Sequence, residues 1–236
     1  MTSVAALDIP LHVKYIQSLG ENKDDLVYHM TAHLRMNAVY WGLTALCVMN
    51  HQDALDREDM ISYVMSCWDD EAGAFGAHPD HDAHLLSTLS AIQILMMQDA
   101  LDRLDIPRVV KCLLLADILS LQQPSGVFAG DAFGEIDARF LYCAVNALSL
   151  LGHLHELDVE KTVGFWVLSA MAILNKIPWI NADKLTEFIL SAQARLSLLG
   201  YPGLEDLDPV YCMPARLIES KGLRKGWKAL PRKVLV

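Results

Sequence analysis

The 236-residue sequence predicts an all-α protein whose helices come in pairs. This follows from three observations: apolar residues recur at helical spacing, alternating β-branched runs are few, and a helix–turn–helix unit repeats along the chain. Hydrophobic residues make up 53% of the chain and charged residues 20%. A sizeable single core can therefore form, and general disorder is excluded.

Strongly apolar helices are expected at Leu34–Met49, Ala83–Met97, Leu141–Leu151 and Val167–Leu174. Within Ala83–Met97, leucines and isoleucines recur every three or four residues, which places them near one face of a helix. The last three segments are apolar over much of their circumference. We expect such helices to be buried on more than one side by helix-on-helix packing.

A unit of two helices joined by a turn occurs at Tyr63–Leu95 and again at Ile118–Leu150. In each copy a Gly-x-Phe turn follows the first helix, and an Asp begins the second helix. These residues, Asp82 and Asp137, are predicted to be helix N-caps. An Asp side chain at that position accepts hydrogen bonds from the first N–H groups of the helix, which have no partner within it.

The repeat is interrupted at two junctions, Phe165–Trp166 and Gln193–Ala194. At each junction the sequence of a first helix runs directly into the later part of a second helix, so the turn between them is missing. Repeat proteins tolerate the loss of whole units better than the loss of half units, because each helix needs a neighbour. The segments that meet at the junctions are Asp158–Phe165 with Trp166–Leu174, and Leu185–Gln193 with Ala194–Gly200.

The formal net charge of −10 argues against general nucleic-acid binding. Charge is unevenly distributed, because Arg216–Val236 contains seven Lys or Arg residues and one Glu. We expect a repeat domain over residues 1–215 and a basic tail over residues 216–236. The tail is interpreted as a solvated segment, with an acidic partner or an anionic membrane surface as the alternative.

A cytoplasmic protein is expected. No positively charged residues precede the first apolar ones, so the N-terminal sequence does not resemble a secretory signal. The uncharged stretches Ala83–Gln98 and Thr162–Asn175 are shorter than the roughly 18 apolar residues of a membrane span. Five cysteines without close pairing indicate reduced thiols that lie mostly in the core.

Five segments that together span most of the chain resemble the β subunits of protein geranylgeranyltransferase type II. This resemblance implies an α/α toroid, as in terpenoid cyclases, with helix pairs around an apolar funnel and here incomplete or open. It also implies an α-subunit partner, a zinc ion, and transfer of geranylgeranyl from geranylgeranyl diphosphate to C-terminal cysteines of a Rab GTPase bound to its escort protein. The segments are Leu34–Leu46, Asp82–Leu95, Phe128–Phe140, Trp179–Leu190 and Asp208–Pro214.

The zinc ligands of this family have no match in the sequence. In the family they are an Asp-x-Cys pair at the start of one late helix and a His at the start of a later one. The matching positions would fall at Phe165–Trp166 and Gln193–Ala194, where this chain is interrupted. No Asp in the sequence is followed two residues later by Cys. Basic residues that contact the diphosphate would be missing with the first junction, so we predict no metal ligands and no catalytic residues in this chain.

Arg139 matches a family arginine that faces the funnel near the substrate peptide. The resemblance therefore implies a substrate-binding role for this residue. The alternative is a structural role, because a buried guanidinium needs an anionic partner, and Glu135 or Asp137 could provide one.

Tyr40 and Trp166 match aromatic residues of the family's funnel wall, which implies that they bind substrate. Trp41 matches a third such residue. Any of the three could instead be an ordinary core residue, and for Trp41 we expect the core position.

Two further patterns invite a metal interpretation. His78, His81 and His84 are spaced by three, with carboxylates between them, but the first two lie in a turn that contains proline. The acidic run Trp68–Glu71 is similar to the magnesium-diphosphate motif of terpenoid enzymes, yet glycine occupies the position of its required second Asp, at Gly73. Neither pattern is expected to bind a metal.

The predicted function is that of a Rab geranylgeranyltransferase β subunit with impaired catalysis. A non-catalytic variant that still binds the α subunit or the lipid is the main alternative. A mis-spliced product is another, because an apolar solenoid without half units would expose patches that promote aggregation.

Overall fold

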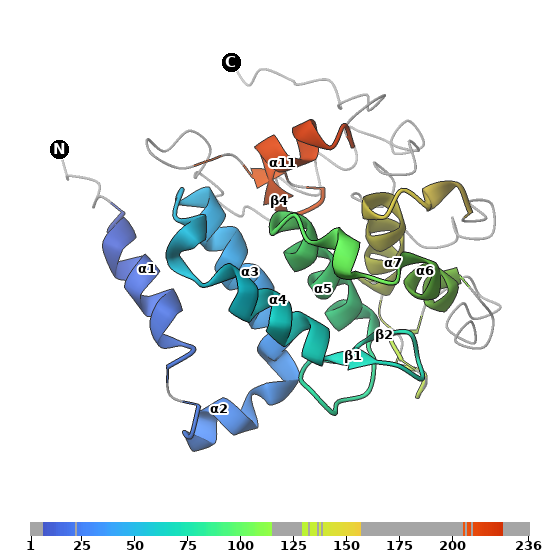
Figure 1. The fold of residues 1–236 in the computed structure, drawn as a ribbon, viewed down its shortest axis with the longest axis horizontal. Helices are drawn as coiled ribbons and strands as arrows, with labels where there is room; N and C mark the ends of the chain where they lie inside the picture. The colour runs from blue at the N-terminus through green and yellow to red at the C-terminus, as the bar shows by residue number, and fades with distance from the viewer. Residues whose placement is uncertain are drawn as a thin grey trace, which may run out of the picture. The chain divides into compact units, whose positions relative to one another are not determined.

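The computed structural model describes residues 7–21, 23–114, 129–131, 133–135, 137, 139–156, 205, 207–208 and 210–223. The chain divides into two compact units, which are treated separately below (Figure 1). One unit comprises Met1–Leu104 with Gly203–Glu205, and the other comprises Asp105–Pro202 with Asp206–Val236. Within the described residues, no helix is both long and apolar enough to cross a membrane.

The first unit consists of helices joined by short 3-10 turns and one small ribbon. Asp8, Asp25 and Asp56 cap the helices α1, α2 and α4, each through a side-chain oxygen that accepts from a backbone N–H of the first turn. The helices are α1 Ile9–Ser18, α2 Leu26–Met30, α3 Arg35–Val48, α4 Arg57–Ser66 and α5 Leu85–Met97; the 3-10 turns are Ala32–Leu34, Gln52–Ala54 and Leu101–Arg103; the strands are β1 Trp68–Asp69 and β2 Ala74–Phe75.

Helices α3 and α4 both pack against α5 (Figure 1). Eleven of the thirteen residues of α5 are buried, so this helix is covered on nearly every side, as its apolar sequence predicted. Ile92 and Leu95 of α5 and Leu43 of α3 are among the fully buried residues. Two polar pairs cross the α3–α5 interface: Ser90 Oγ donates to Asn37 Oδ1 at 2.9 Å, and the Gln93 amide donates to the Tyr40 hydroxyl at 3.3 Å.

The predicted Gly-x-Phe turn is a two-stranded antiparallel ribbon between α4 and α5, in which Trp68 pairs with Phe75. Asp69 builds its turn, because Oδ1 accepts from the backbone N–H groups of Glu71 and Ala72, both at 3.0 Å. Gly73 follows with a φ of +70°, a conformation that glycine adopts without strain. The acidic run identified in the sequence thus shapes a turn.

His84, and not Asp82, is the N-cap of α5, so that sequence prediction was wrong. His84 Nδ1 accepts from the backbone N–H of Leu86 at 3.0 Å. The chain stays extended through His84 because its own N–H donates to the Phe75 carbonyl, which ties it to the ribbon. The ribbon therefore delays the helix start. In the second unit, Asp137 Oδ1 accepts from the backbone N–H of Arg139, the first residue of α7, at 2.7 Å. The carboxylate thus satisfies one of the N–H groups at the start of this helix.

The described part of the second unit contains two apolar helices and a C-terminal hairpin with a short helix. The hairpin strands pair antiparallel, with Leu207 opposite Pro214 and Asp208 opposite Met213. The predicted domain boundary between residues 215 and 216 lies inside the last helix. The elements are α6 Ile106–Leu114, α7 Arg139–Leu150, the 3-10 turn Leu154–Glu156, β3 Leu207–Asp208, β4 Met213–Pro214 and α11 Ala215–Ser220.

A polar stripe along α7 holds this hairpin. Tyr142 donates its hydroxyl proton to the Val210 carbonyl at 2.7 Å and accepts a hydrogen bond from the Asn146 amide, also at 2.7 Å. One turn further along, the hydroxyls of Ser149 and Tyr211 lie 2.7 Å apart and share a hydrogen bond. Spacings of four and three residues place all three α7 side chains on one face, so a single helix face binds two residues of the hairpin turn, Val210 and Tyr211.

Asp208 completes the hairpin from within. Its side chain is fully buried, and Oδ1 accepts from the backbone N–H groups of Val210 and Tyr211 at 2.9 and 3.0 Å. A buried carboxylate is costly unless hydrogen-bonded, and these donors compensate part of that cost. Asp208 therefore has a structural role, because it holds Val210 and Tyr211 where they contact α7.

Arg57 links α4 to the end of α5. Its Nε and Nη2 donate to the Gln98 carbonyl at 3.0 and 2.8 Å, and Nη2 also lies 3.4 Å from the Asp99 carbonyl. Carbonyl groups at a helix C-terminus lack partners within the helix and carry partial negative charge. The guanidinium supplies both a donor and a positive charge at this point.

Replacing Arg57→Ala is expected to lower the free energy of unfolding by about 1–2 kcal/mol, because hydrogen bonds from a charged group to the α5 C-terminus are lost. Urea unfolding of the full chain measures the change. The matched control is Arg103→Ala, which removes only surface ion pairs of 3.7 and 4.0 Å to Glu58 and Asp102 and should cost at most about 0.5 kcal/mol. Equal losses in the two variants would contradict the assignment.

Replacing Tyr142→Phe is expected to cost about 1–3 kcal/mol of unfolding free energy, since the Val210 carbonyl and the Asn146 amide both lose a partner. Tyr15→Phe in α1, where the side chain is exposed, serves as the control and should be nearly neutral. Hydrogen exchange at the Val210 and Tyr211 amides should also accelerate in the α7 variant. Unchanged exchange there would show that the hairpin does not depend on this stripe.

Candidate functional site

Of the three residues predicted to bind substrate, Tyr40 is buried in α3. Its hydroxyl accepts from the Gln93 amide, and its ring centroid lies 4.8 Å from that of Trp41. Trp41 is 55% exposed, so the expectation that it lies in the core was wrong. The sequence could not distinguish the two neighbours, because adjacent residues on a helix point about 100° apart and only one of them can face α5.

Arg139 begins α7 with an exposed side chain. Its Nε and Nη2 lie 2.9 Å from Asp137 Oδ1 and Oδ2, which makes a bidentate pair. Hydrogen bonds from Arg139 lower the pKa of Asp137, and the same pair raises the pKa of Arg139. Asp137 is thus the structural partner that the sequence offered, while the exposed guanidinium remains accessible within its unit.

Trp166, the third predicted residue, lies outside the described residues, as do both interrupted junctions, Phe165–Trp166 and Gln193–Ala194. Of the other two predicted positions, Tyr40 belongs to the first unit and Arg139 to the second.

The cysteines are free thiols. All five lie in the described part of the chain and form no disulfide, and Cys47, Cys67 and Cys143 are buried. Burial raises the pKa of Cys143 to about 12, and it also raises the pKa of Cys67 and Cys212. These surroundings favour the protonated thiol. The buried positions agree with the sequence prediction of reduced thiols that lie mostly in the core.

The loop that carries His78, His81 and His84 has a structural role. His84 caps α5, and His78 Nδ1 lies 3.1 Å from the Pro79 carbonyl, which can only accept. The ring centroids of His78 and His81 are 5.5 Å apart. Gly76 allows the loop to close, because a Cβ at this position would lie 2.3 Å from the His81 carbonyl oxygen.

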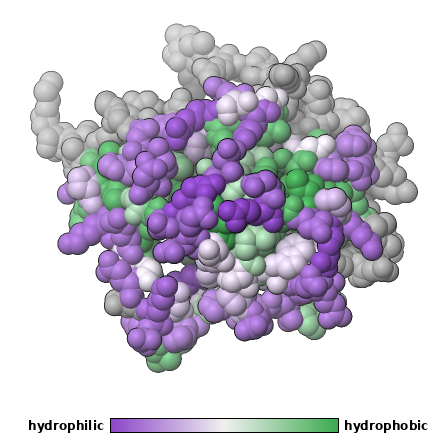
Figure 2. All heavy atoms as spheres, in the orientation of Figure 1, coloured by the Kyte–Doolittle hydropathy of each residue, from purple (hydrophilic) through white to green (hydrophobic). Residues whose placement is uncertain are grey.

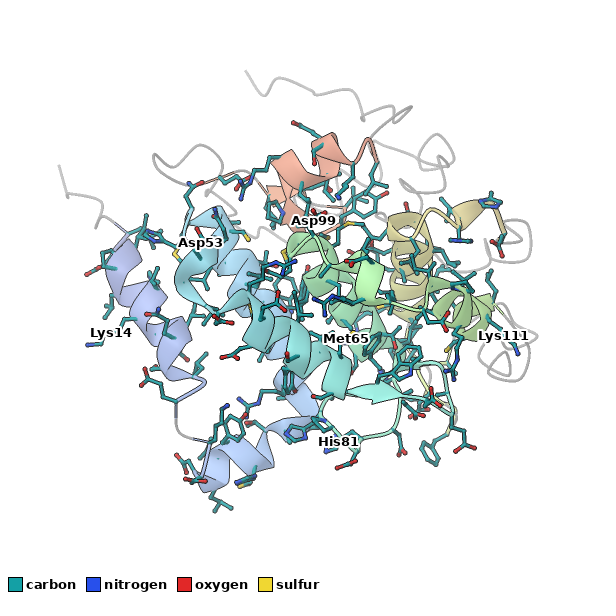
Figure 3. All side chains as sticks on the ribbon, in the orientation of Figure 1. Lys14, Asp53, Met65, His81, Asp99 and Lys111 are labelled. Atoms are coloured by element: carbon teal, nitrogen blue, oxygen red, sulfur yellow. The ribbon has the colours of Figure 1, made fainter. Side chains whose placement is uncertain are left out.

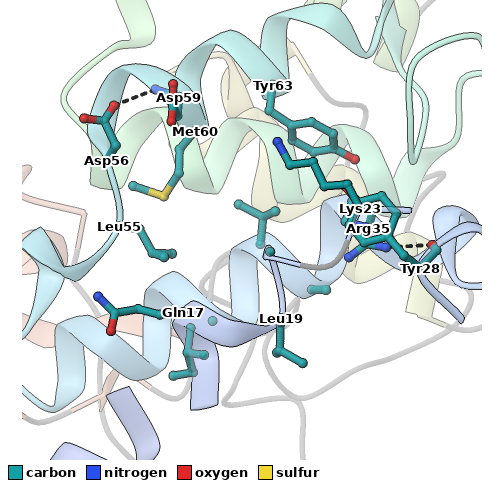
Figure 4. A pocket seen from close by; sticks show the side chains of 15 residues that line it. Gln17, Leu19, Lys23, Tyr28, Arg35, Leu55, Asp56, Asp59, Met60 and Tyr63 are labelled. Carbon is teal, nitrogen blue, oxygen red and sulfur yellow. Dashed lines mark hydrogen bonds between the residues drawn. The ribbon is translucent and has the colours of Figure 1, made fainter. Parts of the chain in front are cut away.

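One feature of the first unit was not predicted: a groove of about 270 Å³ between α1, α3 and α4 (Figure 4). Most of its wall is apolar, and it includes Val39 of α3 and Met60 of α4. Charged groups lie at its ends. Lys23 and Arg35 are at one end, beside Tyr28, and Asp56 and Asp59 are at the other (Figure 4). The sequence contains no short motif for it, because its walls come from three helices.

Comparison with known proteins identifies the family. A model of the prenyltransferase alpha-alpha toroid domain matches residues 7–165 and 164–209. The geranylgeranyl transferase type-2 subunit beta of Saccharomyces cerevisiae is 36% identical over 303 residues, covering 86% of this chain and 93% of the yeast protein. The corresponding Candida albicans subunit is 34% identical over 268 residues, covering 95% of this chain and 76% of its own.

A solved structure supports the fold. Candida albicans protein geranylgeranyltransferase-I complexed with GGPP matches with a TM-score of 0.53 at 12% identity, over 81% of this chain and 57% of that chain. At this identity the likeness concerns the fold alone, and it agrees with the all-helical repeat predicted from the sequence. Together with the family model and the two fungal relatives, it shows that this chain belongs to the prenyltransferase α/α toroid family, among the type-2 geranylgeranyl transferase β subunits.

Proposed function

We propose that this chain serves in the cytoplasm as a β subunit of a Rab geranylgeranyltransferase. Its partners would be a prenyltransferase α subunit, geranylgeranyl diphosphate, and a Rab GTPase with its escort protein. The observation that carries the proposal is the 36% identity to a type-2 β subunit along 93% of that subunit's length. Identity at this level over a whole subunit is more specific than a shared fold.

We further infer that the chain lacks internal segments that its relatives contain. The two family matches meet at residues 164 and 165, beside the junction at which the helical repeat is interrupted. The yeast alignment extends over 303 positions, whereas 86% of 236 residues is about 203, so about 100 aligned positions lie opposite gaps in this chain. Both observations support a loss from the middle of the repeat.

This loss would remove the zinc-binding residues and impair transfer. Zinc, where bound, would convert the substrate thiol into a thiolate nucleophile. No Asp-x-Cys pair is present in the sequence. Losing stabilisation of about 4 kcal/mol in a transition state slows a reaction by about 10³, and metal activation contributes at least several kcal/mol. We therefore expect little transfer by this chain.

Arg139 is the residue in the described part of the chain for which we propose a substrate-binding role. It is exposed, it begins an apolar helix, and Asp137 holds its guanidinium plane in one orientation. An oriented guanidinium is suited to an anionic or carbonyl group of a bound peptide. Tyr40 and Trp166 would line the lipid path by family resemblance.

A non-catalytic role is the alternative, and the altered junctions favour it. A chain that retains the α-subunit surface or the lipid pocket would compete with a complete β subunit without turning over. A mis-spliced product is a further alternative. In that case other transcripts would contain the missing segments, and this chain would not persist in cells. Co-purification with an α subunit therefore distinguishes a non-catalytic binding variant from a mis-spliced product.

The chain co-expressed with a type-2 α subunit is expected to contain much less than one zinc per heterodimer and to prenylate a Rab–escort complex at least about 10³-fold more slowly than a complete enzyme. Elemental analysis and transfer of labelled geranylgeranyl measure these two quantities. One tightly bound zinc together with turnover would refute the predicted defect.

A matched control restores the yeast segments at Phe165–Trp166 and Gln193–Ala194. The restored chain should bind one zinc and recover transfer, because only the metal site and its flanking helices are added. If the restored chain folds with the α subunit but remains inactive, the defect lies elsewhere in the chain.

In the restored chain, Arg139→Gln is expected to raise the KM for the Rab substrate about tenfold, corresponding to about 1.4 kcal/mol, and to affect kcat less. Asp137→Asn is the control, because it keeps the Arg139 guanidinium but weakens the ion pair that orients it. An Arg139 variant with an unchanged KM and a loss of stability alone would assign the residue a structural role.

The Cys143 thiol gives a prediction of pH dependence. Its pKa is raised from about 9 to about 12 by burial, so the thiol ionises more readily in the unfolded chain. Its contribution to stability is present below pH 9 and is lost as the pH rises from about 9 toward 12. Unfolding free energies at pH 8 to 10.5 should fall less steeply in Cys143→Ala than in the unmodified chain. Identical slopes would show that this thiol is not desolvated.

A further inference from the structure

The groove between α1, α3 and α4 combines apolar walls with charges of opposite sign at its two ends. All of its lining residues belong to the first unit. The C-terminal end of α1 is held by two contacts: Gln17 donates to the Ala54 carbonyl at 2.7 Å, and Ile16 lies so close to Gly42 that a Cβ at Gly42 would be 3.3 Å from Ile16 Cγ2. The groove is lined by this end of α1 together with α3 and α4.

Arg35 is fixed at the basic end of the groove. Its guanidinium carbon lies 3.6 Å above the Tyr28 ring centroid, and Nη2 donates to the Tyr28 carbonyl at 2.8 Å. Arg35 Nε is buried and has no hydrogen-bond partner among the described residues. The guanidinium lines the groove, so its charge attracts an anionic group there.

Neighbouring groups make this end attractive to an anion. Lys23 lies beside Arg35 at the same end (Figure 4). Tyr63 stays uncharged, because burial raises its pKa, and its hydroxyl proton is donated to the Ala77 carbonyl at 3.0 Å. At the opposite end, Asp56 is occupied as the cap of α4 and Asp59 follows it. An anion at that end would be repelled, so the charges set one orientation for a bound molecule.

Apolar surface continues from the groove onto the outside of the unit. Leu19 lines the groove and is 48% exposed, and α2 exposes Leu26, Val27 and Met30. Figure 2 shows hydrophobic side chains at the lower tip of the visible face, where α2 lies in Figure 1. Exposed apolar side chains therefore lie near the end of the groove that carries Lys23 and Arg35.

We propose that this groove binds a single-chain amphiphile with an anionic head group, a carboxylate or a phosphate. The head would bind the Arg35 guanidinium and the Lys23 amine, and the aliphatic chain would lie against Val39, Leu55 and Met60. Binding needs neither zinc nor transferase activity, so this inference is independent of the proposed function.

Isothermal titration of the full chain with dodecanoate and with dodecyl phosphate, both below their micellar concentrations, tests the site. Dodecanol and dodecyltrimethylammonium are the matched uncharged and cationic probes. We expect one molecule of at least one anion per chain, at least tenfold tighter binding than either matched probe, and weaker binding as salt increases. The better of the two anions identifies the head group.

Two variants locate the bound molecule. Lys23→Gln should weaken anion binding about tenfold, whereas Lys14→Gln should leave it unchanged, because Lys14 extends away from α3 and α4 (Figure 3). Ala38→Phe should abolish binding of the chain, since the new ring fills the groove from an exposed position of α3. Equal affinity for dodecanol, unchanged binding in Ala38→Phe, or no binding of either anion would overturn the proposal.

Discussion

The coverage of α5 is the constraint on which the described structure depends. An apolar helix with eleven of thirteen residues buried cannot be stable alone, because its exposed surface would cost far more than its own hydrogen bonds return. It is covered by α3 and α4, and its ends are held by the ribbon at His84 and by Arg57 at Gln98. A repeat of such helices is stable only where every second helix has neighbours on both sides. By the same constraint, the segments that we propose to be missing at the two junctions would have supplied neighbours for apolar helices.

Polar groups decide how the apolar helices are placed. In the first unit, Asn37 and Tyr40 of α3 meet Ser90 and Gln93 of α5, so hydrogen bonds set the register of two otherwise uniform surfaces. In the second unit, α7 uses one polar face to hold the hairpin around Asp208. Apolar packing is weakly directional, whereas a buried hydrogen bond is satisfied in only one arrangement. These pairs make the packing specific.

The chemical character of the described residues is structural at several positions that looked functional in the sequence. Asp69 shapes a turn, His84 caps a helix, and Asp137 pairs with Arg139. The cysteines lie in surroundings that keep thiols protonated. The groove differs from these positions, because one N–H of Arg35 has no acceptor among the described residues although Nη2 donates to the Tyr28 carbonyl. A charged side chain that is only partly satisfied indicates a ligand better than acidic or histidine side chains whose hydrogen bonds are already made.

Periodicity and repetition were sufficient to predict the helical class, the helices α3, α5 and α7, and the turn at Gly73, because local apolar spacing and turn chemistry depend on neighbouring residues only. The family resemblance was also carried by the sequence, and comparison with the fungal subunits confirmed it. Tertiary contacts decided the rest. His84 caps α5, and the predicted Asp82 does not, because the ribbon holds His84 in an extended conformation. Trp41 is exposed and Tyr40 is buried, because only one of these two neighbours can face α5. The groove arises from three helices brought together in space, and no local pattern encodes the distance between them.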